Sequence, residues 1–525
     1  MHPTLQHPNR LLLVALGLGF CADYLFYGRW LGISVALFVA LGLAALWWLG
    51  RAEERPPARA NLWLGGAALF FALCIAVRDA PFLVALDLLA TLGLLLLLAA
   101  HYRGAALARL PGGRILTRVL AATAEISLRP APLALQSLGS VHITAEQTRR
   151  LVPVGRGLML AAPVVTVFAG LLMAADSVFA SYMIQAFSLE LPFDLSTILA
   201  HTTVAGIVAW LYAGGVLTAL SRGGPPSFFD TAAGWADKLL DALVGAPSQP
   251  AGTLPAEGDT QPLPVIRRPL LAIGCVEALT MLILVDVLFG GFMLVQAAYF
   301  FGGLDTLARS GMTYAEYARR GFFELVAVAC LALALLWALA LLARRERPWQ
   351  RYAFNAASAA LIVLVLGLLA SAFQRMSLYE QAYGYTRLRL YTHSFMIWLA
   401  VVLGLFLLAL LRGRPRIFSF GGFTAALLYL AALNLANPDA LIVYENVARY
   451  QASSKLDTYY LTHLSADATP ALAEALPRLG EPERTEIASA LTEQRAALAT
   501  TLEVQGWPAW SLSRAQVLVV KISNE

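Results

Sequence analysis

The sequence has few charged residues: aspartate, glutamate, lysine and arginine together make up 14% of the chain. Soluble domains carry about 25% charged residues and about 45–50% apolar ones. Here 59% of the residues are hydrophobic, and the mean hydropathy is +0.67. This composition excludes a water-soluble enzyme, a disordered regulator and a nucleic-acid-binding protein.

Cysteine is scarce as well, with four among the 525 residues. All four lie inside apolar runs, and no pair has the spacing of a disulfide framework or of a metal site. We therefore expect packed thiols, and neither a metal nor a cofactor. The phosphate-binding loop, the dinucleotide fingerprint and the zinc-protease helix are also missing. The sequence assigns no catalytic residue, so it leaves enzymatic activity open and leans against it.

Long apolar runs are abundant, and each is long enough for a membrane span. A spanning helix needs about 20 predominantly apolar residues. Eleven stretches meet this length: 11–28, 30–50, 60–77, 81–100, 157–176, 196–220, 270–300, 321–343, 353–373, 390–411 and 417–436. The sequence therefore predicts an all-α, polytopic transmembrane helix bundle of about eleven spans, followed by a small C-terminal all-helical soluble domain.

Arginine is distributed unevenly between alternate loops. If the N-terminus is cytoplasmic, the cytoplasmic loops carry 23 lysines and arginines and the opposite loops carry eight. Loops rich in positive charge stay in the cytoplasm. We therefore expect a cytoplasmic N-terminus and, after eleven spans, an extracytoplasmic C-terminal region.

The spans are interrupted by segments of different composition. Residues 101–156 mix arginine with apolar residues, and both an amphipathic helix on the inner leaflet and a solvated loop fit that pattern. Residues 221–269 form a Pro/Gly-rich linker. The resulting order of domains is as follows: four spans in 1–100, a cytoplasmic basic segment in 101–156, spans five and six in 157–220, a cytoplasmic linker in 221–269, spans seven to eleven in 270–436, and an extracytoplasmic helical domain in 437–525.

Two neighbouring stretches carry a family resemblance. Phe292 to Gly303 reads FMLVQAAYFFGG, and Thr313 to Leu325 reads TYAEYARRGFFEL. Further matching stretches are Gly157–Phe179, Arg375–Thr386, Asn437–Asp439, Leu456–Ala468 and Trp507–Arg514. Over roughly residues 150–525 the chain resembles the bacterial inner-membrane family labelled domain of unknown function 4173. The resemblance implies a multi-pass protein of the bacterial inner membrane and implies no activity.

Ionisable and strongly polar residues inside spans are candidate functional groups, because burying them in lipid costs about 2.5–3.5 kcal/mol on insertion scales. The candidates are Asp176, Glu277, Asp286, Gln296 and Glu324. Glu277 and Asp286 are nine residues apart, so they point to opposite sides of one helix. Either residue could face a polar cavity, or each could pair with a neighbouring helix. Asp176 ends its span, and capping alone would explain it.

Arginines and tyrosines gather at two boundaries of the spans. The candidates for an anion or headgroup site are Arg319, Arg320, Arg375, Tyr379, Tyr383, Arg387, Arg389 and His393. Arginines beside tyrosines suit phosphate or carboxylate recognition. They equally suit an interfacial aromatic belt with snorkelling arginines. Both interpretations stay open, and Gly384 is expected to break the chain between the two tyrosine-arginine faces.

From these features we expect a transporter-like or a lipid- or anion-handling membrane module. Two other classes stay open: a membrane-embedded transferase acting on a lipid-linked substrate, and a signalling or assembly platform without catalysis. The expected partners are membrane lipid, an anionic lipid or a small solute, and a protein bound through the C-terminal domain. No nucleic-acid partner is expected.

Overall fold

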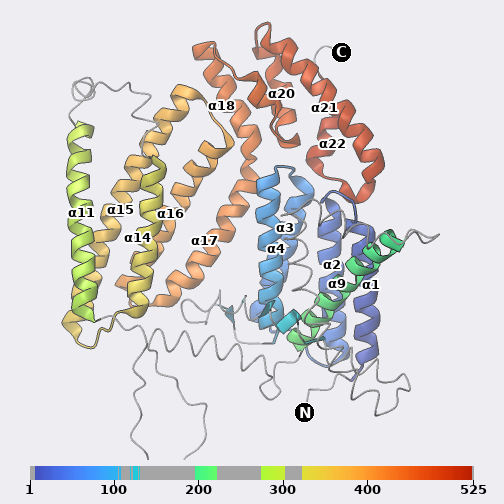
Figure 1. The fold of residues 1–525 in the computed structure, drawn as a ribbon, viewed down its shortest axis with the longest axis horizontal. Helices are drawn as coiled ribbons and strands as arrows, with labels where there is room; N and C mark the ends of the chain where they lie inside the picture. Colours follow the sequence, from blue (N-terminus) through green and yellow to red (C-terminus); the bar gives the residue numbers. More distant parts are fainter. Residues whose placement is uncertain are drawn as a thin grey trace, which may run out of the picture. The chain divides into compact units, whose positions relative to one another are not determined.

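The computed structural model in Figure 1 describes residues 6–103, short pieces within 106–130, and residues 195–220, 274–301 and 322–522. Side chains at 195–196, 295–301 and 322–324 are not part of that description. Asp176, Arg319, Arg320, the predicted span 157–176 and the predicted linker 221–269 therefore lie outside the described residues. So do the side chains of Gln296 and Glu324.

Ten described helices are long and apolar enough to cross a membrane, and they fall on ten of the eleven predicted stretches. They are α1 (Pro8–Phe26), α2 (Ile33–Ala52), α3 (Leu62–Val77), α4 (Pro81–His101), α9 (Leu195–Leu220), α11 (Cys275–Phe301), α14 (Phe322–Leu342), α15 (Pro348–Tyr383), α16 (Arg387–Leu411) and α17 (Pro415–Ala436). The predicted all-α polytopic fold is confirmed, and the protein is a multi-pass membrane protein.

Proline marks where several of these helices begin. Pro8, Pro81, Pro348 and Pro415 occupy the first turn of α1, α4, α15 and α17. Proline is tolerated there because its missing N–H would have no intrahelical partner anyway. Large apolar side chains on the helices remain exposed, with Leu294 of α11 75% and Val363 of α15 61% accessible. Surfaces of this kind suit contact with lipid rather than water.

By its internal contacts the chain divides into two compact units. The first comprises residues 1–29, 40–56 and 123–224, with α1 packed along α9. Gly19 allows this approach, since a Cβ there would lie 2.3 Å from the Ala205 carbonyl oxygen. The Asp23 carboxylate of α1 lies 2.8 Å from Nδ1 of His201 on α9, which is hydrogen-bonding distance. Small residues and a polar pair are the usual means of packing helices in a membrane.

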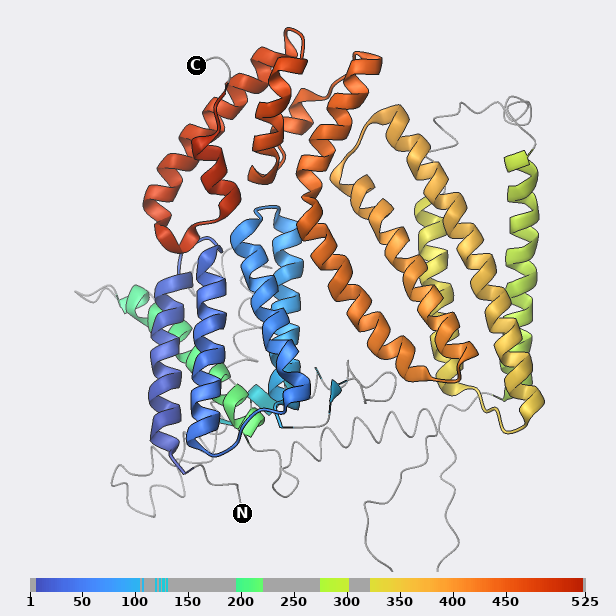
Figure 2. The same ribbon diagram turned by 180° about the vertical axis from the view of Figure 1, so that it is seen from behind.

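The second unit comprises residues 30–39, 57–122 and 225–525. Within it α15 packs against α11, α14 and α16, and α16 packs against α17. Figures 1 and 2 show these helices side by side. The buried face of α15 is continuous and apolar, with Phe354, Leu361 and Val365 fully inaccessible. In the same unit α3 pairs with α4, and α4 also contacts α17.

The C-terminal part of this unit is a set of shorter helices. It contains α18 (Pro438–Ser453), α19 (Thr458–Thr462), α20 (Thr469–Ala475), α21 (Glu483–Gln505) and α22 (Leu512–Val519). Their apolar faces form a separate core around Ile442, Leu472 and Ile487. As predicted, Gly384 separates α15 from α16, and its positive φ of 83° is one that glycine adopts without strain.

Candidate functional site

A polar network lies where the C-terminal helices meet the ends of α3, α4, α16 and α17. It begins at the α17–α18 boundary, where Asn437 adopts a left-handed conformation. Its side chain accepts a hydrogen bond from the Ala440 N–H at 3.3 Å and donates to the Asp467 carbonyl oxygen at 3.1 Å. Asn437 therefore both caps α18 and ties it to the segment before α20.

Asp439 is an acid of this network with no accessible surface. The Arg387 guanidinium donates to its two carboxylate oxygens at 2.8 and 2.5 Å. The Ser465 N–H and hydroxyl donate to the same carboxylate at 3.0 and 2.5 Å. A bidentate arginine and two further donors satisfy a buried carboxylate well. The contact joins the start of α16 to α18.

Asp467 satisfies the start of α4 from a distant part of the sequence. Its Oδ2 accepts hydrogen bonds from the Asp79 and Ala80 N–H groups at 2.9 and 2.7 Å. Oδ1 accepts from the Ser513 hydroxyl. The first N–H groups of a helix have no intrahelical partner, and Ala80 offers no side-chain cap of its own. Asp467 therefore supplies the cap and the negative charge that a helix N-terminus favours.

Arg514 connects the start of α22 to residues 30–32. It forms an ion pair with Asp79 at 2.5 Å and donates to the Leu31 carbonyl oxygen at 3.0 Å. The Ile33 N–H donates to the Trp510 carbonyl oxygen at 2.8 Å. Gly32 permits this contact, because a Cβ there would lie 2.4 Å from the same oxygen.

A second buried acid, Asp87, lies inside α4 opposite α17. The Asn434 side-chain amide donates to its Oδ1 at 2.8 Å, while Oδ2 has no hydrogen-bond partner among the described residues. Arg78 donates to the Asn434 carbonyl oxygen at 2.8 Å. The contacts link α3 and α4 to the C-terminal end of α17, where Arg78 satisfies a carbonyl oxygen of the last helical turn.

The pKa values of Asp439 and Asp79, two acids outside the spans, shift in opposite directions. Burial alone would raise the pKa of the Asp439 carboxyl, but the hydrogen bonds from Arg387 and Ser465 outweigh burial and hold that pKa below its ordinary value. Burial raises the pKa of Asp79 in spite of its ion pair with Arg514. Asp439 is therefore held firmly as the anion.

Next to this network a pocket of about 570 Å³ opens between α4, α14, α16 and α17. Its walls are almost entirely apolar, and they include Phe82, Leu86, Phe395 and Leu430. Polar atoms are few in this pocket. The Tyr429 hydroxyl is hydrogen-bonded to Ser394 at 3.0 Å. The buried Tyr391 hydroxyl and Trp398 indole N–H have no hydrogen-bond partner among the described residues.

The structure uses several predicted anion-site residues for internal contacts. Arg387 pairs with Asp439, and Arg389 donates to the Gly384 carbonyl oxygen at 2.5 Å and lies 4.1 Å from the Tyr379 ring centre. His393 pairs with the buried Glu380 at 2.8 Å. These contacts bring the candidates together around the α15–α16 turn, with Tyr383 packed edge-on against Tyr379. Arg375 is half-buried one turn earlier on α15.

The described intramembrane candidates differ in exposure. Glu277 is exposed in the first turn of α11, and Asp286 is half-buried on the same helix. The Asp286 Oδ1 is buried and has no hydrogen-bond partner among the described residues. The two side chains do not meet any other predicted site residue in the part of the chain that the structure describes.

Three buried polar residues in these contacts were not among the site residues predicted from the sequence. Glu380, Asn434 and Asp467 are buried. Glu380 and Asp467 lie in stretches that carry the family resemblance, but the resemblance implies no role for them. Glu380 contacts His393, which is 13 residues away in the sequence. Asn434 contacts Asp87, 347 residues away, and Asp467 contacts Asp79, 388 residues away. Only Asp467 had a local signal, because Ser465 two residues earlier forms a turn with its N–H.

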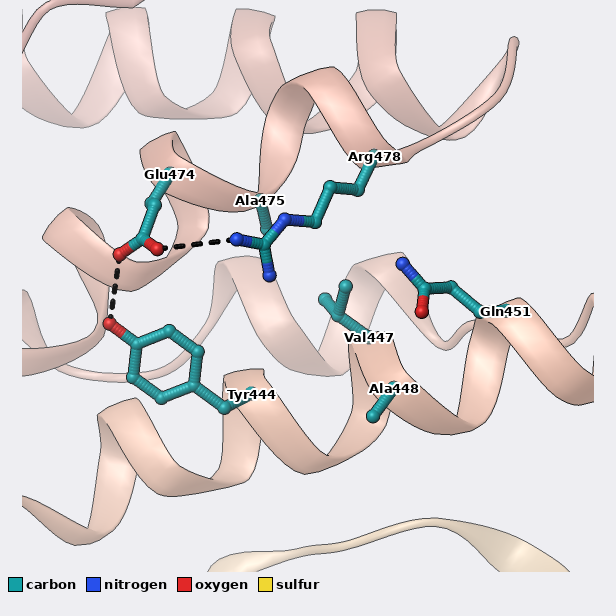
Figure 3. Close-up of a pocket in the computed structure, with 7 residues that line it drawn as sticks. All are labelled: Tyr444, Val447, Ala448, Gln451, Glu474, Ala475 and Arg478. Carbon is teal, nitrogen blue, oxygen red and sulfur yellow. Dashed lines mark hydrogen bonds and ion pairs between the residues drawn. The ribbon is translucent and has the colours of Figure 1, made fainter.

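A smaller cavity of about 130 Å³ lies between α18 and α20, and Figure 3 shows its polar wall. Glu474 accepts a hydrogen bond from the Tyr444 hydroxyl at 3.1 Å and pairs with Arg478 at 3.5 Å. The Glu474 carboxylate therefore pairs with both Tyr444 and Arg478 in this wall of the cavity. Among the described residues no group of three His, Cys, Asp or Glu could hold a metal ion.

The fold and the pocket define a multi-pass, all-α membrane protein with a helical C-terminal region. The family model of a domain of unknown function (DUF4153) matches residues 65–475, from α3 to the end of α20. The chain belongs to this family. The number 4173 expected from the sequence is wrong, and the match begins earlier, inside the third span. No curated protein and no solved structure matches the chain.

Proposed function

We propose that this protein is a lipid-handling module, which binds the apolar part of a lipid or lipid-linked molecule between α4, α14, α16 and α17. One observation carries the proposal: the pocket holds two buried donors, on Tyr391 and Trp398, that have no partner among the described residues. Buried polar groups in native proteins are nearly always hydrogen-bonded. A ligand with one polar atom beside Tyr391 and another beside Trp398 would satisfy both donors.

The size and lining of the pocket support the same conclusion. Ligand pockets typically measure about 300–1,000 Å³ and are mostly apolar with a few polar groups that fix orientation. The pocket here falls in that range and follows α16 from Tyr391 to Trp398. Its apolar walls suit a hydrocarbon chain. The polar end of the ligand would lie toward Tyr391, one turn beyond Arg387.

Replacing pocket residues should reduce the amount of lipid retained by the purified full chain. Ala426→Trp fills the pocket and should lower occupancy at least about tenfold, since a bulky ring leaves no room for the ligand. Tyr391→Phe removes one donor and should lower affinity about fivefold, as expected for one hydrogen bond. Native mass spectrometry in mild detergent measures the retained lipid.

The matched control for this test is Leu428→Trp, because Leu428 lies two residues away on α17 and is 65% exposed. This control should retain lipid like the unmodified chain. Unchanged occupancy in Ala426→Trp, or an equal loss in Leu428→Trp, would remove the pocket from the function.

The proposal includes an orientation in the bacterial inner membrane with a cytoplasmic N-terminus. The excess of arginine in alternate loops supports it. The pocket and the polar network would then lie on the extracytoplasmic side. Reporter fusions after Ala180 and Ser513 should be active outside the cytoplasm, and a fusion after Gly413 should be active inside. The reverse pattern would overturn the orientation.

A further inference from the structure

A second and larger pocket, of about 680 Å³, lies at the opposite ends of α14, α16 and α17 from the pocket beside Tyr391. It is bounded by the end of α14, the start of α15, the end of α16 and the start of α17. Trp337, Leu410 and Phe418 form apolar walls, while Arg345, Arg351 and Asn355 supply polar groups. The pocket thus combines a wall suited to hydrocarbon with a cationic rim.

The positive charge around this pocket is concentrated and lacks a balancing negative charge. Seven arginines lie in residues 343–351 and 411–419, together with one acid, Glu346. They are Arg344, Arg345, Arg347, Arg351, Arg412, Arg414 and Arg416. Within the described residues none of them forms an ion pair with a carboxylate. Six of the seven are exposed, Arg351 among them, and Arg345 is half-buried.

The two arginines that line the pocket are held in place by the protein. Arg345 donates to the Ala340 carbonyl oxygen at 2.5 Å and lies 4.5 Å from the Phe354 ring centre. Arg351 donates to the Arg345 carbonyl oxygen at 3.1 Å. Burial lowers the pKa of Arg345, and the nearby Arg351 guanidinium lowers it further. A bound anion would offset this repulsion between two neighbouring cations.

We infer that this pocket binds the phosphate headgroup of an anionic phospholipid, with Arg345 and Arg351 at the phosphate and an acyl chain along Trp337 and Phe418. Arginine is well suited to phosphate because its planar guanidinium donates two parallel hydrogen bonds. Basic pockets between membrane helices recognise lipid headgroups of this charge. The apolar walls favour a phospholipid over free phosphate, which would gain nothing from them. The inference does not rest on the function proposed for the pocket beside Tyr391.

Removing the two pocket arginines should selectively weaken binding of the anionic lipid. We expect the full-length double variant Arg345→Gln/Arg351→Gln to bind phosphatidylglycerol about 30-fold more weakly, or about fivefold for each charge lost. Phosphatidylcholine with the same acyl chains should bind both proteins equally weakly. Titration of each lipid into detergent-solubilised protein, followed by native mass spectrometry, measures the affinities.

Two further variants separate the pocket from its surface charge and from misfolding. Arg414→Gln/Arg416→Gln removes the same charge at exposed residues that do not line the pocket, and it should change the affinity by no more than about threefold, because charges away from the bound headgroup are screened by salt. Ala340→Phe keeps every arginine, narrows the pocket and should also weaken phosphatidylglycerol binding. Equal loss in the two arginine pairs, or equal affinity for the two lipids, would overturn the inference. Displacement of the lipid by inorganic phosphate would identify free phosphate as the ligand instead.

Discussion

Replacing Asp467 with alanine should destabilise the protein by about 3–5 kcal/mol, because three donors lose their acceptor at a buried site. The donors are the Asp79 and Ala80 N–H groups just before α4 and the hydroxyl of Ser513. Asp467 is only 2% accessible, so water cannot readily replace the carboxylate. The thermal unfolding midpoint of the full chain in detergent measures the loss.

The control for this variant is Asp457→Ala. Asp457 caps α19 through a single hydrogen bond to the Tyr460 N–H, at an exposed site. Its loss should cost about 1 kcal/mol, the usual value for an N-cap. If Asp467→Ala is no more harmful than Asp457→Ala, the junction between α4 and the C-terminal helices does not stabilise the fold.

Replacing Arg387 with methionine should cost about 3 kcal/mol, because Asp439 would remain as a buried charge without its partner. Breaking a buried ion pair typically costs about 3–5 kcal/mol. The lower end applies here because the Arg387 side chain is 32% accessible and Ser465 still donates to the carboxylate. The unfolding midpoint in detergent again reports the change.

A double variant distinguishes the unpaired charge from lost packing. Arg387→Met/Asp439→Asn contains no buried charge at this site, so it should be more stable than Arg387→Met alone. Arg416→Met is the matched control, since Arg416 is exposed at the start of α17 and has no ion pair among the described residues. A double variant that is less stable than either single variant would contradict the ion-pair account.

The same ion pair determines a pH dependence. The folded protein lowers the pKa of Asp439, so its contribution to stability is complete above the unfolded pKa of about 3.9. The contribution is lost as the pH falls through the lower folded value. The stability difference between the native chain and Asp439→Asn should therefore stay constant from pH 7 to about pH 4 and shrink below it. A decline that begins near pH 6 would show that Asp439 is not held as the anion.

The spans could be predicted from sequence because their cause is local. A run of about 20 apolar residues is sufficient to specify a membrane helix, and the prolines at 81, 348 and 415 indicate where three helices begin. Asn437 and Pro438 likewise indicate the start of α18, since capping depends on neighbours three residues away. These features needed no knowledge of how the helices pack.

The arginines of α16 show where sequence alone is insufficient. The sequence around Arg387 and Arg389 fits an anion site and an interfacial belt equally well, because no neighbouring acid in the local pattern identifies a partner for either arginine. The structure places Asp439, 52 residues later, against Arg387 and a carbonyl oxygen against Arg389. That Arg387 and Arg389 also bind an anion or a headgroup stays a prediction from their residue types.

The sequence by itself determined that this chain crosses a membrane many times and where most of its helices lie, because transfer of apolar side chains into lipid depends on composition. Only the tertiary structure decided which polar groups are paired and which remain unsatisfied. Tyr391 and Trp398 looked like ordinary aromatic residues until packing enclosed their donors beside a pocket. Hydrogen bonds act over about 3 Å, and residues hundreds of positions apart come within that distance only when the helices assemble.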